Sequence, residues 1–249
     1  MRNKISKTFS KIKWVIFANI FMAVLFFSVS PVVATFYGPE PQPGLHEYQF
    51  NNGRYYIYLP AGYNQDGQYP LVVLSYSYIG VTEIEPREFM HSWKNLADGR
   101  NYIVVLPIGG GDVRFIDQWY KNLLETVKSS YAVDSSRILL TGFGAGGHYA
   151  LHLGASNPIG FRAVSPVAGT WEGYWKDRTP FPKKNRPDFY FISGAEDTQA
   201  SPKEVQQVAE SMEKRGYSVR FEKLEGIGHA YSDQFTVKIA DWFDSLSKR

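Results

Sequence analysis

The chain has 249 residues, of which 44% are hydrophobic and 20% are charged, and it contains no cysteine. This length and composition exclude a disordered chain and a small disulfide-stapled scaffold, and they suit one sizeable domain with its own core. The formal net charge of +3 comes from the first 34 residues, which hold five basic residues and no acidic one, so that the rest has 22 basic and 24 acidic residues. We therefore expect no nucleic-acid partner, because no basic surface remains in the body of the chain.

Residues 1–34 have the pattern of an export signal. A basic run over residues 1–13 precedes an apolar run over 14–29, and Val-Val-Ala at 32–34 suits cleavage before Thr35. The apolar run is shorter than the roughly 20 residues that a membrane-spanning helix needs, and an uncleaved anchor stays open as the alternative. In both cases we expect an exported body, either extracellular, periplasmic or anchored, whose membrane contact is confined to this segment.

The Pro- and Gly-rich stretch over residues 35–53 predicts an irregular lead-in, and residues 54–249 are expected to form one domain. Short apolar runs predict strands at 54–59, 71–77, 102–106, 138–141, 161–167, 189–192 and 219–224. A helical period predicts helices at 114–131, 144–154, 205–214 and 235–246. The expected inner face of the first helix consists of Phe115, Trp119, Leu123, Leu124 and Val127. This order indicates an α/β fold with a mostly parallel central sheet and helices on both faces.

The most informative stretch is ILLTGFGAGGHYALHL at residues 138–153, where a predicted strand runs into a glycine-dense turn and a helix. In α/β hydrolases such a turn has the pattern G-x-S-x-G and presents a nucleophilic serine. Here Gly144 occupies the place of the serine, between Gly142 and Gly146. Glycine relieves the backbone strain at the apex of the turn and removes the hydroxyl. The pattern therefore predicts the turn without its nucleophile.

The same stretch also fits G-x-G-x-x-G, the dinucleotide-binding fingerprint, through Gly142, Gly144 and Gly147. That fingerprint requires an acidic residue at the end of the next strand, about 20 residues further on, to bind the ribose. The first acid after the next predicted strand is Glu172, which follows another glycine turn and a tryptophan. A dinucleotide-binding enzyme stays an alternative, and we expect no cofactor.

Three segments carry a family resemblance: YAVDSSRILLTGFGAGGHYAL with FRAVSPVAGTW, then FISGAEDTQASP, then EGIGHAYS. From about Arg54 to the C-terminus the chain resembles bacterial secreted α/β hydrolases of the polyhydroxybutyrate depolymerase and feruloyl esterase type. In that family the segments carry the nucleophile turn, the catalytic acid and the catalytic histidine, in the chain order of this fold.

The resemblance implies that Asp197 is the acid and His229 the base, with Glu196 as the reserve acid. In an active enzyme of this type, the histidine takes the proton of the serine and the carboxylate holds the imidazole ring. Both residues follow predicted strands, which places them at the carboxyl edge of the sheet. The alternative is that Asp197 caps a turn and that His229 is a surface-loop histidine.

The oxyanion segment also departs from the family, which usually has His-Gly after the strand ending near Leu74. Here the chain reads Ser75-Tyr76-Ser77-Tyr78. The candidate oxyanion donors are Ser75, Tyr76 and Ala145. Substitute nucleophiles are Ser75, Ser77, or a water molecule activated by His229.

Other residues give weaker signals. His148 and His152 are four apart on a predicted helix, but they lack the Glu of H-E-x-x-H and a third ligand, so we expect no metal site. Trp171 and Trp175 lie in an irregular stretch after a predicted strand, where aromatic side chains can stack on a ligand or cover the core.

The sequence therefore predicts an exported esterase- or depolymerase-like α/β-hydrolase-fold protein whose catalysis is impaired or absent because the turn reads G-F-G-A-G. We expect it to bind a small ester, a polymer, a carbohydrate-linked ligand or a partner protein at the former active site. The alternatives are an active carboxylic-ester hydrolase with a non-standard nucleophile and a dinucleotide-binding enzyme.

Overall fold

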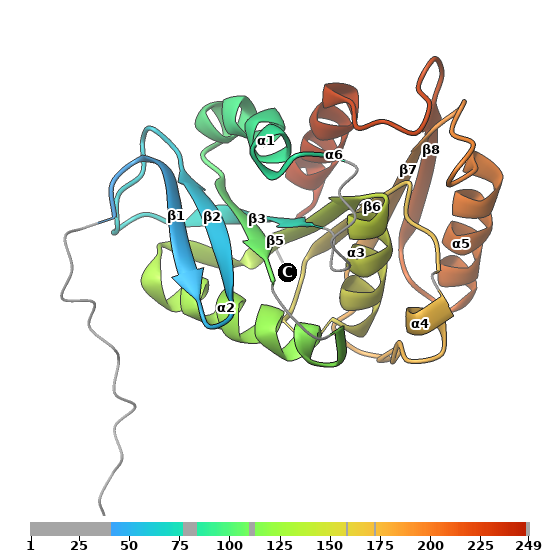
Figure 1. The fold of residues 1–249 in the computed structure, drawn as a ribbon, viewed down its shortest axis with the longest axis horizontal. Helices are drawn as coiled ribbons and strands as arrows, with labels where there is room; N and C mark the ends of the chain where they lie inside the picture. Colours follow the sequence, from blue (N-terminus) through green and yellow to red (C-terminus); the bar gives the residue numbers. More distant parts are fainter. Residues whose placement is uncertain (1–40, 77–83, 110–112, 158, 172, 248–249) are drawn as a thin grey trace, which may run out of the picture. The chain divides into compact units, whose positions relative to one another are not determined.

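The computed structural model describes residues 41–76, 84–109, 113–157, 159–171 and 173–247. These residues form an eight-stranded sheet in the order β1-β2-β4-β3-β5-β6-β7-β8 (Figure 1). The strands are β1 (Gly44–Phe50), β2 (Gly53–Leu59), β3 (Tyr69–Ser75), β4 (Ile103–Ile108), β5 (Val133–Phe143), β6 (Ala163–Val167), β7 (Asp188–Gly194) and β8 (Val219–Leu224). The helices are α1 (Pro86–Arg100), α2 (Ile116–Ser130), α3 (Ala145–Ser156), α4 (Gly173–Lys176), α5 (Pro202–Lys214) and α6 (Asp233–Ser245).

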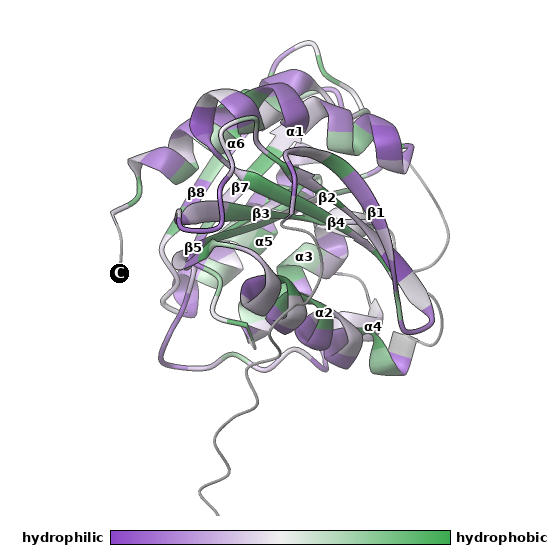
Figure 2. Cartoon of the chain, turned by 90° about the vertical axis from the view of Figure 1, so that its left-hand side faces the viewer, coloured by the Kyte–Doolittle hydropathy of each residue, from purple (hydrophilic) through white to green (hydrophobic). Residues whose placement is uncertain are grey.

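The sheet is mostly parallel, as predicted. Strands β4, β3, β5, β6, β7 and β8 pair in parallel, whereas β2 is antiparallel to both β1 and β4. Helices α1 and α6 lie together on one face, and α2 and α3 lie on the opposite face (Figure 2). All the residues of β3 and β7 are buried, which explains why these strands have continuous apolar sequences without alternation.

The predicted lead-in over 35–53 is wrong in its second half, because Gly44–Phe50 forms the edge strand β1. The strand pairs with β2 through a tight turn in which Asn51 has a φ of 50°. Most β1 side chains are exposed, so the strand has no apolar pattern from which it could be predicted. The formation of such an edge strand depends on pairing with its neighbouring strand more than on its own composition.

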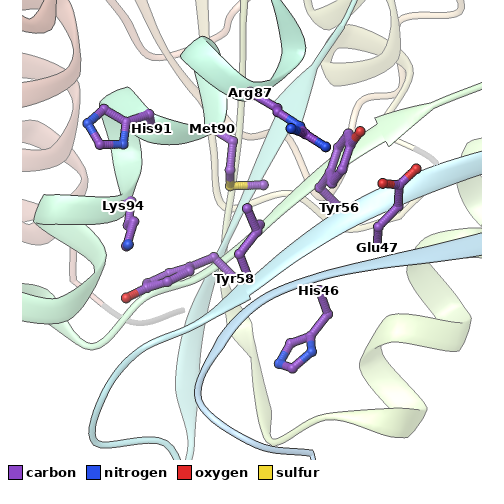
Figure 3. A pocket seen from close by; sticks show the side chains of 9 residues that line it. His46, Glu47, Tyr56, Tyr58, Arg87, Met90, His91 and Lys94 are labelled. Carbon is purple, nitrogen blue, oxygen red and sulfur yellow. The ribbon is translucent and has the colours of Figure 1, made fainter.

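Helix α1 was not predicted either, although it buries Phe89, Met90, Trp93 and Ala97 and has a proline in its first turn. Proline at a helix start and this i, i+4, i+8 spacing were the available signals. Helix α1, β1 and β2 together line a pocket (Figure 3).

The inner face expected for helix 114–131 begins one residue too early. Phe115 is 66% exposed, because it ends a short 3-10 turn and occupies the N-cap position of α2 with φ −114° and ψ 0°. The apolar stripe starts at Ile116 instead and continues through Trp119, Leu123, Leu124 and Val127.

Residues 1–34, the predicted export signal, lie outside the described residues. Within the part of the chain that the structure describes, none of the helices combines the length and the hydropathy that crossing a bilayer requires.

Candidate active site

The turn between β5 and α3 consists of one residue, Gly144. Its φ of 52° and ψ of −117° lie in a region of backbone conformation that residues other than glycine adopt at a cost of about 1–3 kcal/mol. The Gly144 N–H donates to the carbonyl oxygen of Val167 at 3.1 Å, and its own carbonyl accepts from the N–H of His148 at 2.9 Å. The chain therefore changes from strand to helix at the carboxyl edge of the sheet, as the glycine pattern predicts.

The neighbouring glycines allow backbones to approach each other closely. A Cβ atom added at Gly142 would lie 2.8 Å from the carbonyl oxygen of Ser75, and one added at Gly147 would lie 2.5 Å from that of Val167. A Cβ at Gly146 would come closer to the Ser75 carbonyl oxygen than the 3.0 Å that real Cβ atoms keep. The glycine pattern is thus explained by packing of the turn against β3 and β6 inside the protein.

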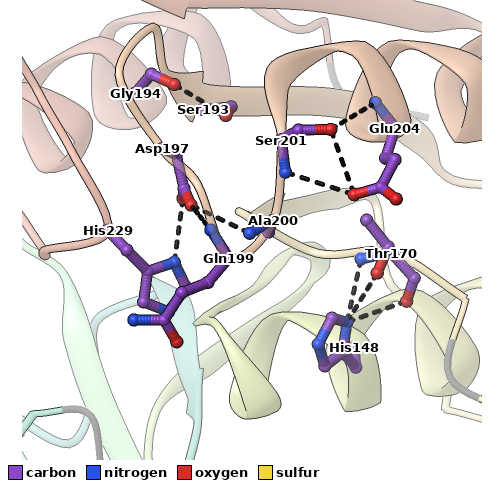
Figure 4. A network of polar contacts seen from close by, with 10 residues as sticks. All are labelled: His148, Thr170, Ser193, Gly194, Asp197, Gln199, Ala200, Ser201, Glu204 and His229. Carbon is purple, nitrogen blue, oxygen red and sulfur yellow. Dashed lines mark hydrogen bonds and ion pairs between the residues drawn. The ribbon is translucent and has the colours of Figure 1, made fainter.

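Asp197 and His229, predicted as acid and base, lie together after β7 and β8. The Nδ1 of His229 is 2.9 Å from Oδ2 of Asp197 (Figure 4). The other carboxylate oxygen, Oδ1, accepts the backbone N–H groups of Gln199 at 2.9 Å and Ala200 at 2.8 Å. The side chains of Asp197 and His229 are only 1% and 9% exposed. Glu196, the reserve acid, is exposed, and it is Asp197 that bonds the imidazole.

The Asp197 carboxylate is held in place by three hydrogen bonds, two from backbone amides and one from His229. Such a carboxylate fixes the orientation and the tautomer of the ring that donates to it, with the proton on Nδ1. The loop after β7, which carries Asp197, is also bonded to the loop after β8, which carries His229 and which we call the histidine loop. The backbone N–H of Ala195 donates to the carbonyl of Leu224 at 2.8 Å, and that of Glu196 donates to the carbonyl of Ile227 at 3.0 Å. We call this hydrogen-bonded pair of side chains, Asp197 and His229, the Asp197–His229 dyad.

The dyad lies beside the turn. The ring of Phe143, the residue before Gly144, is 5.0 Å from the ring of His229 between centroids, and it is 5.8 Å from the ring of Tyr231. Turn and histidine loop therefore contact each other directly, although they are far apart in the sequence. The sequence analysis did not predict that Phe143 packs against His229. The position of Phe143 directly before Gly144 was the sequence feature that could have indicated it.

Tyr231 anchors the histidine loop to the helices on the α1 side of the sheet. Its hydroxyl accepts from Nε1 of Trp93 at 3.2 Å and lies 2.7 Å from the hydroxyl of Thr236, and its ring packs edge-on against Phe89 at 4.9 Å. Burial raises the pKa of the Tyr231 phenol to about 12, so the hydroxyl stays protonated at neutral pH. Sequence analysis also missed this residue.

The three oxyanion candidates come together at the turn. Ser75 pairs with Gly142 at the end of β3, Tyr76 follows it, and Ala145 is the first residue of α3; all three are buried. A backbone N–H at the start of a helix is well placed to stabilise an oxyanion.

The Ser75 hydroxyl is poorly placed to act as a nucleophile. Ser75 is 1% exposed, and its Oγ is buried beside the phenol of Tyr120 on α2. Burial also raises the pKa of that phenol, so Tyr120 offers no base to activate the serine. Ser77, the other candidate, lies outside the described residues.

Trp175 is a core residue and not a ligand platform. It is 3% exposed and stacks on His152 with ring centroids 4.2 Å apart. Trp171 is half-buried and packs edge-on against Phe181 at 5.7 Å. Of the two tryptophans proposed to bind a ligand, only Trp171 keeps an exposed part.

The two histidines of α3 have separate structural partners. The Thr170 N–H donates to Nδ1 of His148 at 2.9 Å. The buried His152 bonds Asp117 through Nε2 at 3.0 Å and the Thr179 hydroxyl through Nδ1 at 2.8 Å. Among the residues with described positions, no group of three His, Cys, Asp or Glu side chains has a metal-binding arrangement.

Comparison with solved structures shows the same fold in esterases. Esterase 2 of Thermogutta terrifontis superposes with a TM-score of 0.61 at 17% identity, covering 85% of this chain and 95% of its own. S-formylglutathione hydrolase of Staphylococcus aureus gives a TM-score of 0.63 at 10% identity, covering 80% of this chain and 98% of its own. A thermostable esterase gives 0.62 at 15% identity, covering 82% and 63%.

Sequence comparison gives a more local match. The bifunctional acetylxylan esterase/xylanase XynS20E of Neocallimastix patriciarum is 30% identical over 84 residues, which is 31% of this chain and 12% of that protein. The chain thus spans a small part of this relative. The model of the dienelactone hydrolase family matches residues 110–238, more than half of the chain, including the turn, Asp197 and His229. With the α/β-hydrolase fold that its esterase neighbours share, the chain belongs to the dienelactone hydrolase family.

Proposed function

We propose that this protein is an exported, esterase-like member of its family with impaired or absent catalysis, which binds an ester-bearing ligand beside the Asp197–His229 dyad. One observation carries the proposal: the acid–histidine bond of 2.9 Å is formed next to a turn that has Gly144 where a nucleophile would stand. The site keeps the general base and has lost the atom that the base would activate.

The chemical consequence follows from the roles in a catalytic triad. The histidine accepts a proton from the nucleophile while the nucleophile attacks the carbonyl carbon, and without a hydroxyl at position 144 no acyl-enzyme forms there. In a comparable serine hydrolase, loss of the nucleophile lowers turnover by a factor on the order of 10⁶. The residual rate comes from the oxyanion donors and from substrate positioning.

The nature of the ligand is inferred from the relatives. The matched part of XynS20E belongs to an acetylxylan esterase/xylanase, and the structural neighbours are esterases. Together with the resemblance to polyhydroxybutyrate depolymerases and feruloyl esterases, this supports a small ester, a polymer or a carbohydrate-linked ester as the ligand. Export is supported by the basic and apolar runs of residues 1–34.

A second candidate function is slow ester hydrolysis by water. It is favoured by the orientation of His229, because an imidazole held by a buried carboxylate can deprotonate a water molecule directly. Catalysis through Ser75 has no comparable support, since its hydroxyl lies beside the protonated phenol of Tyr120. Dinucleotide binding has none either, because the glycines of its fingerprint are explained by backbone packing.

Hydrolysis of a short-chain aryl ester by the wild-type protein tests the proposal. We expect the rate to stay below that of an active serine hydrolase by a factor on the order of 10⁶, and to be unchanged in His229→Ala, because the histidine has no hydroxyl to activate. The matched control is His46→Ala, which removes a histidine of β1 away from the dyad. Turnover that is robust in the wild type and in the control but lost in His229→Ala would overturn the proposal and show hydrolysis that depends on His229, with water or a substitute serine as the nucleophile.

A further inference from the structure

A pocket of about 410 Å³ lies between the β1–β2 hairpin and α1 (Figure 3). It is lined by Leu45, His46, Glu47, Tyr56, Tyr58, Arg87, Met90, His91 and Lys94. The pocket is separate from the Asp197–His229 dyad, because the residues of α1 that contact the histidine loop are Phe89 and Trp93. We call it the α1 pocket.

The floor of the α1 pocket is apolar and aromatic. Tyr56, Tyr58 and Met90 are 6%, 4% and 1% exposed, so their positions are fixed by the core. The Tyr58 hydroxyl donates to the carboxylate of Asp98 at 2.8 and 2.9 Å, so this hydroxyl already has its acceptor inside the protein. Burial and the bond to Asp98 raise the pKa of Tyr58 to about 12, so the phenol carries no negative charge at neutral pH.

The rim of the pocket is positively charged. Among the described residues, neither Arg87 nor Lys94 forms an ion pair or a hydrogen bond, and the Lys94 ammonium lies 5.6 Å from the centroid of the Tyr58 ring. The acidic residue of the rim, Glu47, has an ion-pair partner in Arg54 at 3.6 Å. Nε2 of His46 donates to the carbonyl of Gln42 at 2.7 Å. In the described part of the chain, two cations therefore line the pocket without an ion-pair partner.

Figure 3 shows Arg87 near Tyr56 and Lys94 near Tyr58, and only Lys94 of these two lies over a ring, that of Tyr58. A ligand with a flat apolar body can lie on the rings, and a carboxylate on that body can reach a cation at the rim. A small hydrated anion would use the cations but leave the aromatic floor uncovered. The volume lies within the roughly 300–1,000 Å³ range of small-molecule sites.

We propose that the α1 pocket binds a small aromatic carboxylate, with its ring against Tyr56 and Tyr58 and its carboxylate bonded by Arg87 and Lys94. Arginine binds a carboxylate through two parallel hydrogen bonds, and lysine adds a point charge that is close to the ring. This site does not depend on the nucleophile position or on the dyad, and it holds whether or not the protein hydrolyses esters.

The test is a titration of the exported body, ¹⁵N-labelled, with benzoate, benzyl alcohol and acetate, followed by amide chemical shifts. We expect saturable benzoate binding with shifts concentrated in β1, β2 and α1, and affinity at least about 10-fold lower for acetate and benzyl alcohol, because each lacks one half of the recognition. Arg87→Gln and Lys94→Gln are expected to weaken benzoate binding by about 10-fold each. Lys121→Gln, at an exposed cation of α2, serves as the matched control and is expected to leave it unchanged.

The variants are expected to fold, because Arg87 and Lys94 have no ion-pair partner to lose among the residues with described positions, and a thermal melt checks this. His229→Ala is expected to bind benzoate like the wild type, which separates this proposal from that for the dyad. Benzoate affinity that is unchanged in both glutamine variants would overturn the proposal. Equal affinity for acetate would also overturn it and indicate a simple anion site.

Discussion

Gly144→Ser is expected to convert the protein into a measurable ester hydrolase, with kcat/KM for a short-chain aryl ester at least about 10³-fold above the wild type. The Asp197–His229 bond is already formed, and the backbone of the turn already has the φ of 52° and ψ of −117° that end β5 and start α3. The introduced hydroxyl therefore supplies the missing atom without requiring the turn to change. We expect a gain smaller than the roughly 10⁶-fold change that removal of a nucleophile causes, because the segment at Ser75 and Tyr76 departs from the family.

The matched control is Gly144→Ala, which brings the same backbone strain without a hydroxyl. Both variants are expected to lose about 1–3 kcal/mol of unfolding free energy, because a Cβ is placed at a positive φ. Only Gly144→Ser is expected to gain activity, and the gain is expected to disappear in the double variant with His229→Ala. A Gly144→Ser protein that folds and binds the ester but has the rate of Gly144→Ala would show that the dyad does not serve this position.

Gly146→Ala is expected to have the largest effect on stability, a loss of about 3 kcal/mol or more in the free energy of unfolding. Its Cβ would overlap the carbonyl oxygen of Ser75, and the neighbouring atom is backbone of a fully buried strand that cannot rotate away. The turn would have to move from β3, and this would separate Ala145 from the oxyanion segment. Chemical denaturation measures the change.

Gly99→Ala is the matched control for this prediction. Gly99 is an exposed residue of α1, and a Cβ added there meets nothing within 4 Å. We expect Gly99→Ala to be neutral or to stabilise the protein by up to about 1 kcal/mol, because alanine restricts the unfolded chain and favours the helix. Equal stability of the Gly146→Ala and Gly99→Ala proteins would contradict the close backbone approach at the turn.

The buried strands could be predicted because burial on both faces leaves a continuous apolar run, as in β3 and β7. The edge strand β1 could not be predicted, because its side chains are mostly exposed and its composition does not indicate that it pairs with β2. The α1 pocket could not be predicted from the sequence either. Of the three elements that line it, β2 was predicted, but β1 and α1 were not.

The proximity of Asp197 and His229 could be predicted because both follow strands that end at the same edge of a parallel sheet. Orientations could not be predicted in the same way. Ser75 was expected near that edge and lies there, but its hydroxyl is buried beside Tyr120. The bond between Trp93 and Tyr231 joins residues 138 positions apart, and packing of this kind has no local signal.

Covalent labelling tests most directly whether the site lacks only its nucleophile. The wild type, Gly144→Ala, Gly144→Ser and Gly144→Ser with His229→Ala are each treated with an organophosphate such as paraoxon, and the intact mass and the modified peptide are determined. We expect one adduct at position 144 in Gly144→Ser, much slower labelling when His229 is also replaced, and no adduct in the wild type or Gly144→Ala. A wild-type protein that is labelled at another serine, or a folded Gly144→Ser protein that is not labelled at all, would contradict the account.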